Sequence, residues 1–132
     1  MKNVRRNLLM ALAMLSLASP MLLAARTPWI EKVPPHEHDR ANIMASDPDA
    51  AAAGRLLFED HCARCHGNTA EGKGKRPSLR SERIQDIATP GDLHWFLVNG
   101  SLGRGMPSWS KLPDQQLWQI ITYLKTLKNE AR

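Results

Sequence analysis

Cys62, Cys65 and His66 form a Cys-x-x-Cys-His run, and these two cysteines are the only ones in the chain. Two intervening residues place the thiols at i and i+3, on one side of a helical turn. Such thiols can add to the two vinyl groups of a haem, while the adjacent imidazole reaches the iron as an axial ligand. The run therefore predicts one covalently attached haem c, with Cys62 and Cys65 as attachment sites and His66 bound to iron.

The Cys-x-x-Cys spacing alone also occurs in redox dithiols, in disulfides and in one half of a zinc site. A redox dithiol is expected beside a βαβ pattern, and no segment here alternates with the two-residue period of a strand. A zinc site needs two further ligands. Because His61 and His66 flank the cysteines, a Cys2His2 site stays open on residue type alone.

A second iron ligand is expected from a methionine. Beyond the apolar N-terminal stretch, Met44 and Met106 are the only methionines. Met106 lies between Gly105, which lets the backbone approach a ring closely, and Pro107, which stiffens the loop. We therefore expect the Met106 thioether to bind the iron, a ligand that raises the reduction potential.

Four histidines compete with Met106 for the sixth iron position. His94 is expected on a helix with its ring partly exposed, and His61 is too close to the attachment turn to reach the far side of the iron. His36 and His38 would need a large fold-back. Their i, i+2 spacing suits a metal site on a strand, which the surrounding sequence does not predict, although a metal role stays open.

The first 25 residues differ in kind from the rest. Lys2, Arg5 and Arg6 precede an uncharged, mostly apolar stretch of 18 residues, 8–25. This pattern predicts a bacterial export signal, which suits a haem attached outside the cytoplasm. Cleavage after Ala24 or Ala25 would give a periplasmic protein. Since the length also suits a membrane span, an uncleaved anchor on the outer face of the inner membrane is the alternative.

The sequence of the remaining residues predicts an all-α domain over 47–132, preceded by a Pro-rich linker over 26–46. Helices are expected from Asp47-Pro48, from the Thr89-to-Asp92 capping box, and from Pro113-Asp114, with a short helix over 81–87. Loops are expected over 67–82 and 101–112. The apolar positions of the last helix lie on one face, and they are Leu117, Ile120, Ile121, Leu124 and Leu127.

The positive charge of the chain is concentrated in two places. Three of the five net charges belong to Lys2, Arg5 and Arg6, so residues 26–132 carry about +2, which gives no argument for nucleic-acid binding. A second group lies near the attachment motif. It indicates either a solvated loop or a positive rim that steers an acidic redox partner, and its members are Arg64, Lys73, Lys75, Arg76, Arg80 and Arg83.

On these motifs the chain resembles the class I mono-haem cytochrome c family over residues 47–132. The features that carry the resemblance are Gly54 and Phe58, Cys62 to Gly67, Pro77 and Leu79, Met106-Pro107, and Trp118 with Tyr123. The resemblance implies three main helices around one haem, with Gly54 where the first and last helices cross. It implies that the Pro77 carbonyl accepts a hydrogen bond from His66 Nδ1 and that Leu79 lines the cofactor. Trp95 and Trp109 would pack near the haem.

The expected function is single-electron transfer without bond chemistry. The donor would be a dehydrogenase or a quinol-oxidising complex, and the acceptor a terminal oxidase. The run from Trp95 to Trp109 resembles small cytochromes that accompany quinoprotein dehydrogenases. Two alternatives stay open: a permanent electron-transfer subunit of a larger oxidoreductase, and a haem enzyme or gas sensor, which requires that Met106 leave the iron open.

Overall fold

The computed structural model describes residues 29–130, so the predicted export signal or anchor over 1–25 lies outside the described residues. The described part contains helices and loops and no strand, which confirms the all-α prediction; its bridges are isolated pairs. No helix in residues 29–130 combines the length and the apolar composition needed to cross a membrane. The elements are η2 (Ile30–Lys32), α2 (Pro35–His38), α3 (Pro48–His61), α4 (Ala63–His66), η3 (Arg83–Ile87), α5 (Pro90–Asn99), η4 (Leu102–Arg104) and α6 (Asp114–Glu130).

Helix α3 begins where the sequence predicts it. The Asp47 carboxylate accepts hydrogen bonds from the backbone N–H groups of Asp49 and Ala50, and Pro48 occupies the first helical position. The cap satisfies amide groups that have no partner within the helix. The helix runs to His61, and α4 follows directly after Cys62, so the cap fixes the start of the helix that leads into the attachment motif.

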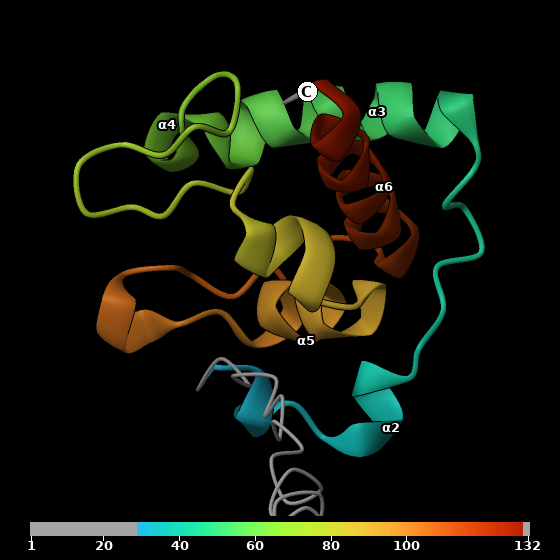
Figure 1. Cartoon of the computed structure of the whole chain (residues 1–132), viewed down its shortest axis with the longest axis horizontal. Coiled ribbons are helices and arrows are strands. Elements are labelled where there is room, and N and C mark those ends of the chain that lie inside the picture. Colours follow the sequence, from blue (N-terminus) through green and yellow to red (C-terminus); the bar gives the residue numbers. More distant parts are fainter. Residues whose placement is uncertain (1–28, 131–132) are drawn as a thin grey trace, which may run out of the picture.

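Helices α3 and α6 cross, and Figure 1 shows α6 running across α3. Gly54 lies at this crossing, because a Cβ there would stand 1.9 Å from the carbonyl oxygen of Gln119 on α6. Beside it, the rings of Phe58 and Tyr123 pack with centroids 5.4 Å apart. The close approach of two backbones requires a residue without a side chain, which confirms the implied crossing point.

Helix α5 is fixed at both ends by its own sequence. The Thr89 hydroxyl accepts from the Asp92 backbone N–H and the Asp92 carboxylate accepts from the Thr89 N–H, which confirms the capping box. Gly100, at φ 67°, ends the helix. The turn expected over 81–87 is a single π-helical turn at Arg83–Ile87, and Lys125 of α6 caps it by donating to the carbonyls of Ile84, Gln85 and the following Ala88.

The core lies between α3, α5 and α6. The predicted stripe of α6 is buried together with Trp118, and it packs against Phe58 of α3 and Leu93 and Leu97 of α5. Burying such side chains supplies about 1.5–3 kcal/mol each. This packing holds the three helices in fixed positions, and the loops of the candidate site leave from their ends.

Residues 29–46 differ from the linker expected without regular structure. They form η2 and α2, and they pack on the domain rather than extending away from it (Figure 1). The Trp29 ring meets Phe96 of α5 edge to face with centroids 4.7 Å apart. Proline at the first position of α2 is compatible with a helix start, which the Pro-rich composition concealed. The predicted domain boundary at residue 47 stays a prediction.

Candidate functional site

The Cys62–His66 segment forms one tight helical turn at the end of α3. The backbone N–H groups of Cys65 and His66 both donate to the Cys62 carbonyl, at 3.0 and 2.9 Å. Both cysteines are free thiols; Cys62 is half-buried and Cys65 is exposed. The next residue, Gly67, has φ 86°, a conformation that glycine adopts without strain. The turn thus presents two thiols and an imidazole in a fixed order.

Burial, and secondarily the nearby Cys65, raises the pKa of the Cys62 thiol to about 12. A redox cysteine or a zinc ligand works as a thiolate, so its site favours the negative charge. Here the surroundings favour a neutral sulfur, which is what a thioether provides. Within residues 29–130, no three His, Cys, Asp or Glu side chains gather to hold a metal ion. The donor chemistry therefore fits covalent attachment of haem.

The His66 ring is oriented by the loop that follows it. Its Nδ1 lies 3.0 Å from the Pro77 carbonyl, which confirms the hydrogen bond implied by the family resemblance. Since a carbonyl can only accept, Nδ1 carries the proton and Nε2 keeps its lone pair. The ring is thereby prepared to bind a metal through Nε2. A hydrogen bond of this kind also makes the imidazole a stronger ligand.

Leu79 is held in place by hydrogen bonds on both sides of its peptide unit. Its N–H donates to the Ala70 carbonyl at 2.9 Å, and its carbonyl accepts from Gln85 Nε2 at 2.6 Å. Its side chain is half-buried against the core. The Gln85 side chain also reaches the Leu124 carbonyl of α6. The loop expected to line the cofactor is therefore tied to the last helix.

Met106 sits in a short loop closed on itself. The N–H groups of Ser101 and Met106 each donate to the carbonyl of the other, at 2.8 and 3.1 Å. Gly105, at φ 73°, makes the turn before the methionine. Arg76, from the loop after His66, donates to the Arg104 carbonyl and lies against Gly105. The structure therefore brings the loop of the predicted sixth ligand against the loop that orients His66.

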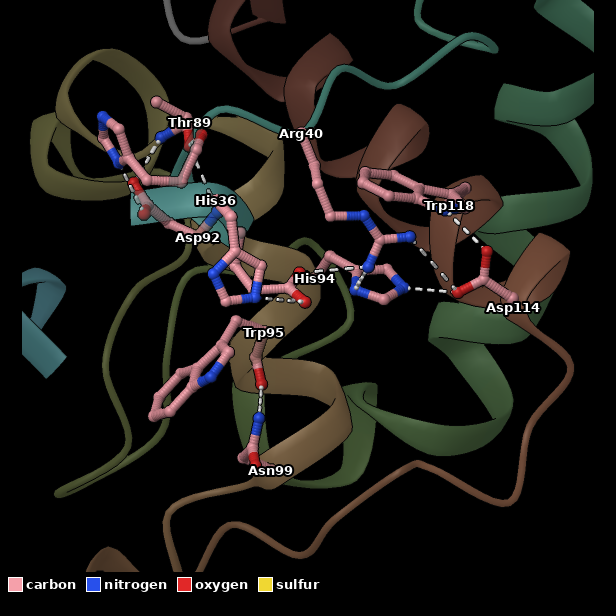
Figure 2. A network of polar contacts seen from close by, with 11 residues as sticks. His36, Arg40, Thr89, Asp92, His94, Trp95, Asn99, Asp114 and Trp118 are labelled. Carbon is pink, nitrogen blue, oxygen red and sulfur yellow. Dashed lines mark hydrogen bonds and ion pairs between the residues drawn. The ribbon is translucent and has the colours of Figure 1, made fainter. Parts of the chain in front are cut away.

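The prediction of a partly exposed His94 was wrong. Its ring is buried and stacks on Trp118, with centroids 4.4 Å apart. Its Nε2 lies 2.7 Å from the Asp114 carboxylate and its Nδ1 lies 3.1 Å from an Arg40 guanidinium nitrogen. Figure 2 shows Arg40 reaching across to His94 and Asp114 beside the Trp118 ring. His94 thus belongs to a network of polar contacts beside Trp118.

Of the remaining predicted residues, His61 and Trp109 lie side by side. His61 packs beside Trp109 with ring centroids 5.1 Å apart, and Trp95 meets Phe96 at the same distance. His36 is exposed. The sequence analysis did not single out Arg40, which joins the network around His94. An arginine in a Pro-rich segment gives no local signal of such contacts.

Comparison with known proteins agrees with this geometry. The family profile described as cytochrome c oxidase, cbb3-type, subunit III matches residues 49–124, more than half of the chain. The chain belongs to the cytochrome c family. Its fold is that of a class I mono-haem cytochrome c, and its cofactor is haem c, covalently attached, which serves electron transfer.

Curated relatives include small cytochromes and larger subunits. The chain is 36% identical over 89 residues to cytochrome c-554(547) of Halothiobacillus neapolitanus, covering 59% of the chain and 97% of that protein. It is 32% identical over 85 residues to cytochrome c550 of Pseudomonas aeruginosa, covering 59% of the chain and 56% of c550. It is 32% identical over 97 residues to the cbb3-type oxidase subunit CcoP of Azospirillum sp., covering 65% of the chain and 31% of CcoP. The match therefore concerns one cytochrome domain, which is about half of c550 and a third of CcoP.

A solved structure shows the same fold. The crystal structure of cytochrome CL from the marine methylotrophic bacterium Methylophaga aminisulfidivorans superposes with a TM-score of 0.57 at 25% sequence identity. The superposition covers 79% of this chain and 70% of cytochrome CL. The shared region thus extends beyond the 76 residues of the family match.

Proposed function

We propose that Cys62 and Cys65 attach the haem and that His66 and Met106 bind the iron on opposite sides. Haem c supplies a one-electron ferric–ferrous couple. In this assignment Pro77 orients His66, Leu79 lines the ring, and the Met106 loop delivers a neutral sulfur. With both iron positions filled, the chain exchanges electrons and catalyses no bond change.

The observation that carries this proposal is the orientation of His66 together with the position of Met106. The Pro77 carbonyl leaves His66 Nε2 available to a metal. Arg76 bridges the two loops that hold His66 and Met106. An electron carrier needs its iron ligands to stay in place in both oxidation states. Movement of the ligands between the two states would add reorganisation energy to every electron transfer. Two short loops tied together suit that requirement.

We further propose that the protein works in the bacterial periplasm, free or held at the outer face of the inner membrane. Its donor would be a dehydrogenase or a quinol-oxidising complex, and its acceptor a terminal oxidase. The predicted export signal supports the compartment. The likeness to an oxidase subunit in the family profile supports an acceptor of that class.

Replacement of Met106 by leucine tests the ligand assignment. Leucine keeps the side-chain volume and removes the sulfur, so packing changes little. We expect the Met–ferric charge-transfer band of the wild type to disappear in Met106→Leu and the reduction potential to fall by on the order of 100 mV. Optical spectroscopy and a spectroelectrochemical titration measure both.

Met44→Leu is the matched control, because it removes the other methionine of residues 26–132 and should leave the band unchanged. A wild-type protein with a high-spin ferric spectrum and no such band would overturn the carrier assignment. That outcome would favour the haem enzyme or gas sensor with an open iron position.

A second candidate is a permanent electron-transfer subunit of a larger oxidoreductase. The specific observation in its favour is that CcoP relatives contain this domain within longer chains. Purification from native membranes separates the two candidates. A subunit stays with its partners through a wash in high salt, whereas a free carrier is released by it.

A further inference from the structure

Residues 29–46, which we call the N-terminal strap, lie before the region matched by the family profile and contact α5 through part-buried hydrogen bonds. A Cβ at Gly91 would stand 1.8 Å from the Glu37 carbonyl oxygen, so only glycine fits beneath the strap. The Thr89 hydroxyl donates to the His38 carbonyl at 2.7 Å, and His38 Nδ1 donates to the fully buried Asp92 carboxylate at 2.8 Å. These contacts make the strap part of the folded domain.

The second half of the strap reaches α6. Asn42 Nδ2 donates to the Thr122 hydroxyl at 2.8 Å, and the Arg40 guanidinium lies over the Trp118 ring, 5.1 Å from its centroid. A second guanidinium nitrogen of Arg40 lies 3.9 Å from the Asp114 carboxylate. The strap therefore contacts both helices between which the Met106 loop runs.

Arg40 fixes the protonation pattern of His94. A guanidinium can only donate, so the His94 Nδ1 it faces must accept, and the proton of the neutral ring is then on Nε2. That N–H donates to the Asp114 carboxylate. Figure 2 shows the resulting chain of contacts from Arg40 through His94 to Asp114. His94 is thereby held from two sides while it stacks on Trp118.

This chain of contacts closes the base of the Met106 loop. The loop leaves α5 after Asn99 and enters α6 at Asp114, and the His94–Asp114 bond joins these two helices. Further along, the Trp109 N–H donates to the Leu97 carbonyl and the Ser108 hydroxyl donates to the Val98 carbonyl. A change in how α5 and α6 meet would move the loop with them.

We propose that Arg40, His94 and Asp114 are positioning residues for Met106, which they keep seated at the sixth iron position by holding the base of its loop. The inference rests on the proposed role of Met106 as an iron ligand. It assigns a part in the iron site to a strap residue that lies before the family match. Loss of either the Arg40 or the His94 side chain should weaken the Met–iron bond indirectly, by releasing the base of the loop that carries Met106.

Competition with imidazole tests the inference on the haem-loaded protein. Imidazole binds ferric iron only when Met106 leaves, so its apparent Kd reports how firmly the methionine is seated. We expect the Kd to fall about tenfold in Arg40→Gln and in His94→Phe, since hydrogen bonds to charged or buried groups are worth about that factor. His94→Phe keeps the ring stacked on Trp118 and removes both hydrogen bonds.

Arg55→Gln is the matched control. The Arg55 side chain pairs with Glu59 on the same helix at 2.9 Å, outside the chain of contacts from Arg40 to Asp114, so imidazole affinity should stay at the wild-type value. In the double variant Arg40→Gln/His94→Phe, the effects should not add, because both changes break one chain of contacts.

The outcomes separate the two proposals. If the wild type lacks the Met–ferric band, the ligand assignment fails and the positioning role fails with it. If the wild type shows the band but both single variants bind imidazole as the wild type does, only the positioning role is overturned. A lower free energy of unfolding with unchanged imidazole affinity would also reject it, because that result describes a purely structural network.

Discussion

At the scale of single residues, the site depends on groups that orient others. The Pro77 carbonyl selects the His66 tautomer, and Arg40 selects that of His94. Lys125 does similar work in the core, where its ammonium group donates to the carbonyls of Ile84, Gln85 and Ala88 at 2.8–3.2 Å. Each of these three groups can act in only one way in its hydrogen bonds: the Pro77 carbonyl accepts, and the Arg40 and Lys125 side chains donate.

Replacement of Lys125 by methionine should lower the free energy of unfolding by about 2 kcal/mol at pH 7, because three carbonyls lose their donor. Denaturant unfolding of the haem-loaded protein measures this.

Burial lowers the pKa of Lys125, with nearby Asp86 partly opposing the shift. The folded state therefore releases this proton at lower pH than the unfolded chain, and stability relative to Lys125→Met should rise as the pH approaches 10.5. If the free energy of unfolding of the wild type relative to Lys125→Met fell as the pH rises toward 10.5, the lowered pKa of Lys125 would be contradicted.

At the scale of helices, the crossing of α3 and α6 positions the attachment turn. Gly54 allows the backbones to touch, and the Phe58–Tyr123 pair fills the space beside it. The attachment turn begins at Cys62, only four residues after Phe58, which contacts Tyr123 of α6. The angle at which α3 meets α6 therefore sets where the thiols and His66 lie.

Gly54→Ala should lower the free energy of unfolding by about 3 kcal/mol, because the added methyl group would collide with the Gln119 carbonyl. Helix propensity alone predicts the opposite sign, a gain of about 1 kcal/mol. Ala52→Gly, at an exposed position of the same helix, supplies the reference for propensity and should cost about 1 kcal/mol. Equal or greater stability of Gly54→Ala would show that the helices can separate freely.

The helix starts could be predicted from the sequence because their causes are local. Asp47 and Thr89 cap amide groups two or three residues away, so the relevant atoms are neighbours in the chain. The strap and the burial of His94 could not be predicted in this way. His94 meets Arg40 across 54 positions and Asp114 across 20. No periodic pattern in the strap signals contacts over such separations.

At the scale of the whole molecule, the positive rim contains exposed residues and residues that also hold loops together. Arg64, Lys73, Lys75 and Arg83 are exposed. Arg76 donates to the Arg104 carbonyl, and Arg80 Nε donates to the Thr69 carbonyl at 2.6 Å. These two arginines hold loops together while they contribute charge. We therefore propose that steering of a redox partner depends mainly on the exposed members of the rim.

Lys75→Glu should slow oxidation of the reduced protein by ferricyanide, a small trianion, about fivefold at low ionic strength and less than twofold at about 0.5 M salt. Stopped-flow kinetics measure the rates. Lys32→Glu makes the same charge change on the strap, and its effect should be smaller at every salt concentration. Equal effects of the two variants would mean that overall charge, rather than the rim, governs the approach.

The strap also bears on the order in which the domain folds. It precedes every helix of the core in the chain, yet its partners Asp92 and Thr122 lie 54 and 80 residues further on. The strap cannot be seated until almost the whole chain is available, because each of these contacts closes a long loop. Seating of the strap is therefore expected to be a late step of folding, which follows the formation of α5 and α6.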